Sequence, residues 1–310
     1  MFSLRIVTVD HYLAAPVPRL DPGFSRLGGW EVWKVPVIRI FGVTSGGQKA
    51  CLHVHGVFPY LCVPFDEDSG ERADKFAPML ASELDLLLNT AAGRAASRQR
   101  HVHHVEAFRG TPLYGFHNKE RTFLKIYLYN PYSVKKVADL LLSGMVLKKV
   151  MQPHEAHIPF ALQFLIDHNL HGMSFVNVGK FKFRRANLDL DSSKLPVRNS
   201  RSDTHVWVLR DMPPDMFLDL QVQKQTTCEL ELDCSSEDIV NPRDADKGEM
   251  NPGLSALWRD EEERRARRGD ASTLVAPLSH DRLGVMKTDS ELFYIRKLDK
   301  LLRAAQSTDR

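Results

Sequence analysis

The chain has 310 residues, a length at which one large domain or two smaller ones are expected. Hydrophobic residues make up 43% of it, enough for a substantial core, and no apolar run reaches the roughly 18 residues of a membrane-spanning helix. Four scattered cysteines with no C-x-x-C pair suit a reducing compartment, which predicts the cytosol or nucleus. The formal net charge is only +3, but residues 101–200 hold 14 lysines and arginines against 7 aspartates and glutamates, an excess that would attract phosphates.

The first 150 residues are predicted to alternate strands with helices. Period-2 alternation of β-branched residues indicates strands, and leucines and alanines at helical spacing followed by glycine indicate helices. Residues 16–30, which are rich in proline and glycine, are predicted to form a loop. The predicted strands are 2–10, 35–43, 47–63 (one long strand, or two pieces bent at Gly56 to Pro59), 98–108, 122–130 and 145–152, and the predicted helices are 74–93 and 131–144.

Residues 50–150 therefore follow the order β-α-β-β-α-β, which is the ferredoxin-like unit also used by RNA-recognition modules. The predicted fold class is α+β, with mixed and antiparallel sheets that include this module. Beyond it, a helix is predicted at 158–169. Further strands are predicted at 173–183, 204–210 and 226–234, and residues 241–310 are predicted to be a largely disordered, charged tail with helices near 252–268 and 290–305.

Two histidine-rich stretches invite a test for metal binding. His154 and His157 flank Glu155, but zinc peptidases place their histidines four residues apart on one helix face, and Pro159 instead predicts that a helix starts here, with Glu155 near its first turn. The stretch HVHH at 101–104 puts two histidines on one strand face, which does not close a metal site. No metal site, no catalytic residue and no cofactor of its own are predicted for the chain.

A glycine-rich stretch at 42–49, GVTSGGQK, differs from a phosphate-binding loop because Gln48 separates the last glycine from Lys49. It joins two predicted strands rather than a strand and a helix. The sequence therefore predicts a hairpin turn here.

Aromatic and basic residues alternate on the predicted strand 122–130. Lys125, Tyr127 and Tyr129 share one face with Phe123, and an open sheet face of this kind can stack and neutralise a single-stranded nucleic acid. The alternative is that the face packs on a neighbouring sheet or domain.

A second candidate for nucleic-acid contact is the stretch 179–185, GKFKFRR. Lys180, Lys182 and Arg184 would share a strand face, with Arg185 after them, and could follow a phosphate backbone. The alternative is a solvated sheet edge whose lysines prevent aggregation.

Several stretches resemble the amino-terminal region of B-family DNA polymerases, and most of all the zeta branch of that family, which acts in translesion synthesis. Together they cover most of residues 1–268 in order. They are MFSLRIVTVDHYLA at 1–14, CLHVHGVFPYLCVP at 51–64, YGFHNKERTFLKIYLYNP at 114–131, QPHEAHIPFALQFLIDHNLHGMSFVNV at 152–178, TTCELELDCSSEDIVN at 226–241 and NPGLSALWRDEEERRARR at 251–268.

The resemblance implies an amino-terminal polymerase domain at 1–240 that lies beside the template strand and braces the exonuclease-like and palm domains. It implies DNA primer–template, the remaining polymerase domains and the accessory subunits as partners, a nuclear location, and no membrane. The full-length family would use Mg and an iron–sulfur cluster bound by regions absent here. Because the palm motifs D-x-x-S-L-Y-P-S and Y-G-D-T-D-S and the exonuclease motif F-D-I-E do not occur, we expect a fragment without polymerase activity.

Two other classes of function remain open from the sequence. The ferredoxin-like order and the aromatic face would also suit a free-standing module that binds single-stranded RNA. A scaffold that binds only protein, with the predicted helix at 290–305 as its docking element, would show no salt-sensitive binding of nucleic acid.

Overall fold

The computed structural model describes residues 1–28, 30–66, 72–94, 97, 99–112, 120–185, 206–208, 212–219 and 222–241. The chain divides into two compact units. Met1–Gly110 with Glu120–Gly253 form the first, and Thr111–Lys119 with Leu254–Arg310 form the second, of which only residues 111 and 112 are described. The helices predicted in the tail and most of the strand predicted at 204–210 lie outside the described residues. Within them, no helix is long and apolar enough to cross a bilayer.

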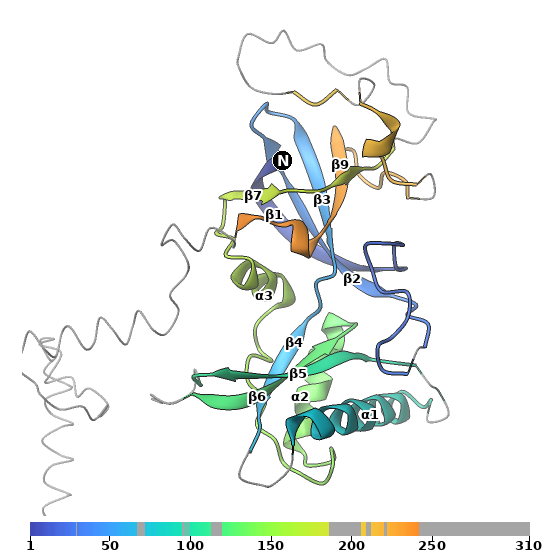
Figure 1. Ribbon diagram of the computed structural model, residues 1–310, viewed down its shortest axis with the longest axis vertical. Coiled ribbons are helices and arrows are strands. Elements are labelled where there is room, and N and C mark those ends of the chain that lie inside the picture. Colours follow the sequence, from blue (N-terminus) through green and yellow to red (C-terminus); the bar gives the residue numbers. More distant parts are fainter. Residues whose placement is uncertain are drawn as a thin grey trace, which may run out of the picture. The chain divides into compact units, whose positions relative to one another are not determined.

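A six-stranded sheet forms one part of the first unit (Figure 1). Three consecutive strands run antiparallel at its centre, and the sharp turn between the second and third confirms the predicted hairpin at 42–49. A parallel partner from far along the chain, β9, then pairs with β3. The strands, in sheet order, are β7 (Phe175–Val178), β1 (Phe2–Ala14), β2 (Val35–Thr44), β3 (Lys49–His55), β9 (Leu230–Ser235) and β8 (Lys182–Phe183).

One face of this sheet carries an apolar core. Leu4, Ile40, Leu52 and Leu232 lie on four different strands and are fully buried there, and α3 (Phe160–Asp167) packs against the same cluster. Each side chain of this kind contributes about 1.5–3 kcal/mol when it leaves water. Because strand side chains alternate between faces, the residues between these positions point to the opposite side of the sheet.

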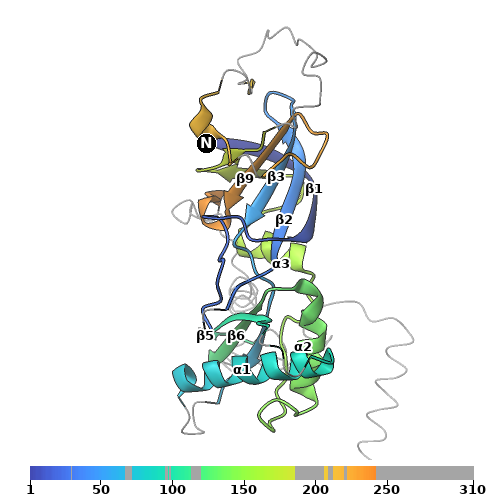
Figure 2. The ribbon, with the colours of Figure 1, turned by 90° about the vertical axis from the view of Figure 1, so that its right-hand side faces the viewer.

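A three-stranded antiparallel sheet, in the order β4-β6-β5, forms the other part of the unit. Its helices lie on one face, where Leu61 and Leu124 of the strands pack with Leu84 and Val137 of the helices (Figure 2). The elements, in chain order, are β4 (Tyr60–Pro64), α1 (Ala73–Ala91), β5 (Val102–Gly110), β6 (Arg121–Leu128) and α2 (Val134–Leu142), the last preceded by a 3₁₀ turn at Pro131–Ser133. The α+β class with mixed and antiparallel sheets is as predicted.

The six-element order predicted for residues 50–150 is not formed in full. The predicted strand 47–63 is two strands, β3 and β4, that belong to different sheets. The strand predicted at 145–152 is wrong, because Leu147 and Lys148 adopt left-handed φ angles of 51° and 53° and turn the chain. In its place, His154 makes a single antiparallel bridge to Cys62 on β4, with N···O distances of 3.0 and 2.7 Å.

The helix predicted at 158–169 is present as α3 but begins at Phe160. Pro159 precedes its first residue, a place where the missing N–H of proline removes no helical hydrogen bond. Glu155 lies outside the helix with a left-handed φ of 63°, so its predicted place near the first turn is wrong. The predicted strand 173–183 is likewise interrupted and contributes β7 and β8 to the two edges of the larger sheet.

Candidate nucleic-acid interface and a buried ionic network

The basic stretch at 180–185 is only partly at the surface. Phe181 and Phe183 pack against the core, and Lys182 and Arg184 face the other side, as the alternation predicts. That other side is covered at Arg184, which is only 2% exposed. Its guanidinium donates to both carboxylate oxygens of Asp233, at 2.7 and 2.6 Å, and lies 3.4 Å from the hydroxyl of Tyr12. Arg184 is therefore not available to a nucleic acid, and we remove it from the predicted interface.

Three cations of this stretch remain exposed, and we call Lys180, Lys182 and Arg185 the basic edge. They lie in and next to β8, which is an edge strand of the six-stranded sheet. The Lys182 ammonium donates to the carbonyl of Asp215 at 2.6 Å, and the Arg185 guanidinium lies 4.8 Å from the ring centroid of Phe217. Both predicted uses of the stretch, phosphate contact and protection of a sheet edge, remain compatible with this placement.

Tyr129, the last aromatic residue of the face predicted on strand 122–130, is buried. It is 5% exposed and packs in a cluster with Val35 and Val37 of β2. Its hydroxyl lies 3.2 Å from Nδ1 of His103, and its ring meets that of Phe58 edge-on. Tyr129 is therefore not a stacking surface for a base, and it too is removed from the predicted interface.

Lys125 and Tyr127 are half-buried and engaged with their neighbours. The Lys125 ammonium lies 3.7 Å above the ring of Tyr60 and 5.1 Å from that of Tyr127. The Tyr127 hydroxyl donates to Glu106 at 2.7 Å, and its ring stacks on His104 at 4.2 Å. Burial, and then the Glu106 carboxylate, raise the pKa of Tyr127. These contacts favour the alternative that the face packs within the protein.

Residues of α3 and of the segment before it pack on the aromatic face of the smaller sheet. The hydroxyl of Tyr60 donates to Asp167 at 2.9 Å, and the side-chain amide of Gln163 donates to the Tyr60 carbonyl at 2.8 Å. The ring of His154 lies edge-on to Phe123, with centroids 5.3 Å apart. The aromatic face of the smaller sheet is thus tied to the segment that leads into and forms α3.

A buried ionic network, which the sequence analysis did not predict, occupies the polar face of the larger sheet. The parallel pairing of β3 with β9 sets His53 beside Asp233 and brings Glu231 within reach. His53 Nε2 lies 2.9 Å from Glu231, and His55 Nε2 lies 2.9 Å from Asp233. None of these four side chains is more than 1% exposed. We use "the ionic network" for Arg184, these four residues, Tyr12 and Asp21.

His55 lies between two carboxylates. Its Nδ1 is 2.7 Å from Asp21 and its Nε2 is 2.9 Å from Asp233. Burial lowers the pKa of this imidazole, but the hydrogen bonds to Asp21 and Asp233 outweigh burial and raise the pKa to about 9. His55 is therefore protonated at neutral pH and donates from both ring nitrogens.

His53 takes the opposite charge state. Burial lowers its pKa, so the ring is neutral at pH 7. Tyr12 lies 2.9 Å from its Nδ1, so a hydroxyl that donates there leaves Nε2 to donate to Glu231. Burial would raise the pKa of Glu231, but hydrogen bonds from His53, from Thr226 and from the Gln225 backbone lower it to about 2.

Cys51, His53 and Glu231 stand in the order of a nucleophile, a base and an orienting group, with 3.6 Å between the cysteine sulfur and His53 Nε2. This arrangement does not make Cys51 a nucleophile, because Cys51 is fully buried and burial raises the pKa of its thiol, which keeps the thiol protonated. Among the described residues, no group of three or more His, Cys, Asp and Glu side chains has the geometry of a metal site. The ionic network joins β1, β3, β9, the residue that follows β8 and the loop before β2, which is a structural role.

Comparison with known proteins identifies the family. Residues 1–55 match a family model described as "DNA polymerase zeta catalytic subunit, N-terminal", and residues 56–135 match one described as "DNA polymerase delta catalytic subunit-like, N-terminal domain". The DNA polymerase zeta catalytic subunit of Homo sapiens is 44% identical over 98% of this chain, and that of Drosophila melanogaster is 37% identical over 99%. The chain spans only 10% and 15% of the length of these two relatives.

The chain thus belongs to the catalytic subunits of family B DNA polymerases. Within that family it is an amino-terminal region of the zeta catalytic subunit. A solved family B DNA polymerase from Pyrobaculum calidifontis matches with a TM-score of 0.39 and 19% identity, over 59% of this chain and 18% of that one.

Proposed function

We propose that this chain is the template-side amino-terminal domain of a translesion DNA polymerase, where it contributes to DNA binding and braces the polymerase core. The observation that carries the proposal is the 44% identity to the human zeta catalytic subunit over 98% of the chain. In this proposal, polymerisation, Mg and an iron–sulfur cluster belong to other parts of such a polymerase. The remaining domains, the accessory subunits and a primer–template in the nucleus are its partners.

A domain that braces the polymerase core must be rigid. The ionic network supports this role because it ties five segments of the larger sheet together with charge-assisted hydrogen bonds in a buried setting. The smaller sheet supports it through its own core between the strands and two helices. We include in the proposal that β4, α1, β5, β6 and α2 are a ferredoxin-like module whose last strand has been reduced to the bridge at His154.

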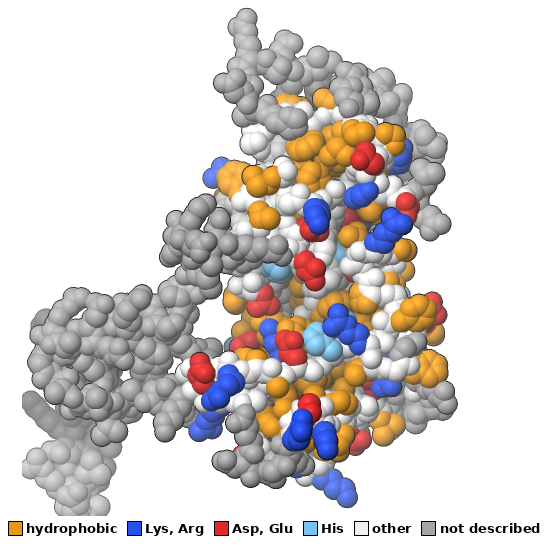
Figure 3. All heavy atoms as spheres, in the orientation of Figure 1, with side chains coloured by type: hydrophobic (Ala, Val, Ile, Leu, Met, Phe, Trp, Pro, Cys, Tyr) orange, Lys and Arg blue, Asp and Glu red, His pale blue; other side chains and the backbone are white. Residues whose placement is uncertain are grey.

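DNA contact is proposed at the basic edge. Its three cations are exposed and lie within six residues of one another, so they can reach successive phosphates. Figure 3 shows lysine and arginine side chains interspersed with acidic ones on the visible face, without a dense basic patch there. We therefore expect weak binding without sequence preference, dominated by counterion release.

The test is a fluorescence-anisotropy titration of the 310-residue chain with a primer–template that carries a 5′ single-stranded overhang, at several salt concentrations. The variant Lys180→Ala/Lys182→Ala/Arg185→Ala is expected to bind more weakly and to lower the slope of log K against log salt by roughly 2. The control Lys135→Ala/Lys136→Ala/Lys148→Ala removes three exposed lysines on and after α2 and keeps the slope. Equal effects of the two triple variants would show that the basic edge is not a specific contact.

The same titration separates the other two functions. A protein-binding scaffold gives no salt-sensitive binding to any strand. A single-stranded RNA module binds RNA more tightly than the primer–template and loses that binding in Tyr127→Ala. The contacts of Tyr127 with Glu106 and His104, and the burial of Tyr129, speak against such an RNA platform.

A further inference from the structure

The loop between β1 and β2 is held firmly although it carries exposed aromatic side chains. Asp21 joins it to the ionic network, since one carboxylate oxygen accepts from the Val17 backbone and from His55. Val32 is buried in the cluster that also contains Tyr129, and its N–H donates to the Gly23 carbonyl at 2.9 Å. The loop is therefore pre-organised rather than loose.

Two large aromatic residues of this loop face solvent. Phe24 is 67% exposed and Trp33 is 71% exposed. Phe24 is one partner of a short antiparallel bridge with Glu31, and Trp33 follows Val32, whose N–H is hydrogen-bonded to Gly23 beside Phe24. Large exposed aromatics on a rigid support are typical of surfaces that bind another molecule.

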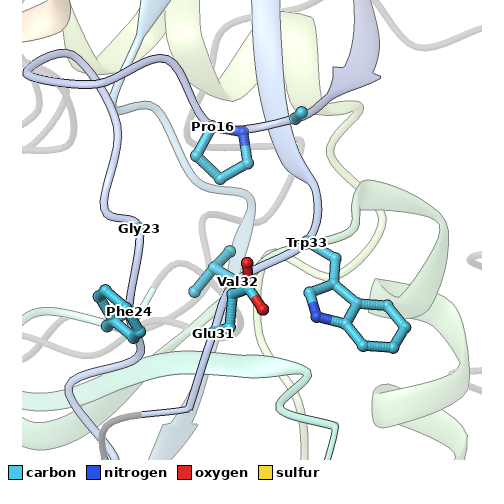
Figure 4. Close-up of a pocket in the computed structure, with 7 residues that line it drawn as sticks. Pro16, Gly23, Phe24, Glu31, Val32 and Trp33 are labelled. Atoms are coloured by element: carbon cyan, nitrogen blue, oxygen red, sulfur yellow. The ribbon is translucent and has the colours of Figure 1, made fainter.

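The two aromatics help to form a cleft of about 470 Å³ that is more open to solvent than enclosed. Its other walls are apolar or backbone, with a single charged residue. Figure 4 shows the carboxylate of Glu31 between Phe24 and Trp33 and below Pro16. The lining residues are Ala15, Pro16, Gly23, Phe24, Glu31, Val32 and Trp33.

The charge of the cleft selects its ligand. Within the described part of the chain, the Glu31 carboxylate has no ion pair or side-chain hydrogen bond, and Arg26 and Lys34, the cations closest to it in the sequence, do not line the cleft. A carboxylate flanked by aromatic rings attracts a cation through both charge and the ring quadrupoles. The same carboxylate repels phosphates, so a nucleic acid strand is disfavoured here.

We propose that this cleft binds a lysine side chain of a partner protein. The aliphatic stem would lie along Pro16 and Val32, and the ammonium group would reach Glu31 between the rings of Phe24 and Trp33. Lysine suits the site because it carries a compact charge on a flexible apolar stem. This inference is independent of the proposed DNA contact, because it uses a different loop and the opposite charge.

The test uses the full chain and the peptide acetyl-Gly-Pro-Lys-Pro-Gly-amide as the probe. The chain has four tryptophans, so its indole N–H signals are few in an NMR spectrum, and Trp33→Phe assigns the signal of interest. The expected result is a concentration-dependent shift of the Trp33 signal. Glu31→Gln is expected to weaken binding by at least about fivefold, whereas Glu120→Gln, which alters an exposed carboxylate elsewhere, leaves it unchanged.

Three outcomes of the titrations of the unchanged chain would overturn the proposal. They are equal binding of a matched peptide with norleucine in place of lysine, a larger shift with a short oligothymidine strand, and no shift with the lysine peptide. Trp33→Ala supplies a second variant, and its thermal unfolding is compared with that of the unchanged chain. Binding to the Trp33→Ala chain is measured by titration calorimetry, because this variant has no Trp33 signal, and full affinity in the folded variant would equally reject the site.

Discussion

Arg184→Met is predicted to unfold the larger sheet at much lower temperature. The guanidinium of Arg184 makes two short hydrogen bonds to Asp233, and neither side chain is more than 1% exposed. Removing one partner of a buried ion pair costs about 3–5 kcal/mol because the other charge stays buried without compensation. In a domain of this size, each kcal/mol lowers the melting temperature by roughly 2–4 °C, so a decrease on the order of 10 °C is expected.

Thermal and urea unfolding, followed by circular dichroism, measure this effect. Lys180→Met is the matched control, because it removes an exposed cation four residues away and should change stability by less than about 0.5 kcal/mol. Arg184→Met/Asp233→Asn should lose less than the sum of the two single changes, since the paired charges are removed together. A cost below about 1 kcal/mol for Arg184→Met would refute the assignment of this residue to a buried network.

Two further predictions concern the same sheet. His55 has a folded-state pKa raised to about 9, so its contribution to the free energy of unfolding is complete below its unfolded pKa of 6.5 and is lost as pH rises through 9. Glu231 has a folded-state pKa lowered to about 2, so its contribution to the free energy of unfolding is complete above pH 4.5 and is lost as pH falls toward 2. The urea midpoint should therefore be highest between pH 4.5 and 6.5, and His55→Asn should remove most of the alkaline decline; an unchanged decline would show that other groups cause it. Gly42→Ala should destabilise the chain by more than about 3 kcal/mol in urea unfolding, because an added Cβ would lie 2.1 Å from the Arg5 carbonyl oxygen. The control Gly23→Ala places its Cβ where no atom lies within 4 Å, so it should be tolerated. Similar urea midpoints for the two variants would contradict this prediction.

The sequence was informative where structure is local. Alternation located β1, β2 and β6, and glycine stops located α1 and α2, because these patterns depend on neighbours a few residues apart. The face shared by Lys182 and Arg184 was also correct. Whether a face is exposed is a different matter, because it depends on distant segments. Tyr12 covers Arg184, and Val35 with Val37 covers Tyr129.

The ionic network was missed for the same reason. His53 and His55 are two residues apart in the sequence, as are Glu231 and Asp233, and this spacing places each pair on one face of a strand. Nothing local showed that β3 and β9 are parallel neighbours, so the two pairs could not be matched. The strand predicted at 145–152 failed because left-handed backbone at Leu147 and Lys148 is unusual for such residues and has no simple sequence signal.

The pairing of β3 with β9 has a consequence for synthesis on the ribosome. The residues that meet there, such as His53 and Glu231, are separated by 178 positions. While the intervening chain is still being made, the edge of β3 that pairs with β9 is unpaired, and His53 and His55 lack their contacts with Glu231 and Asp233. The smaller sheet and its helices, whose strands lie between β3 and β9 in the sequence, can form meanwhile. Maturation of the larger sheet should therefore be a late, slow event that leaves an exposed strand open to chaperones or to faulty pairing with other chains.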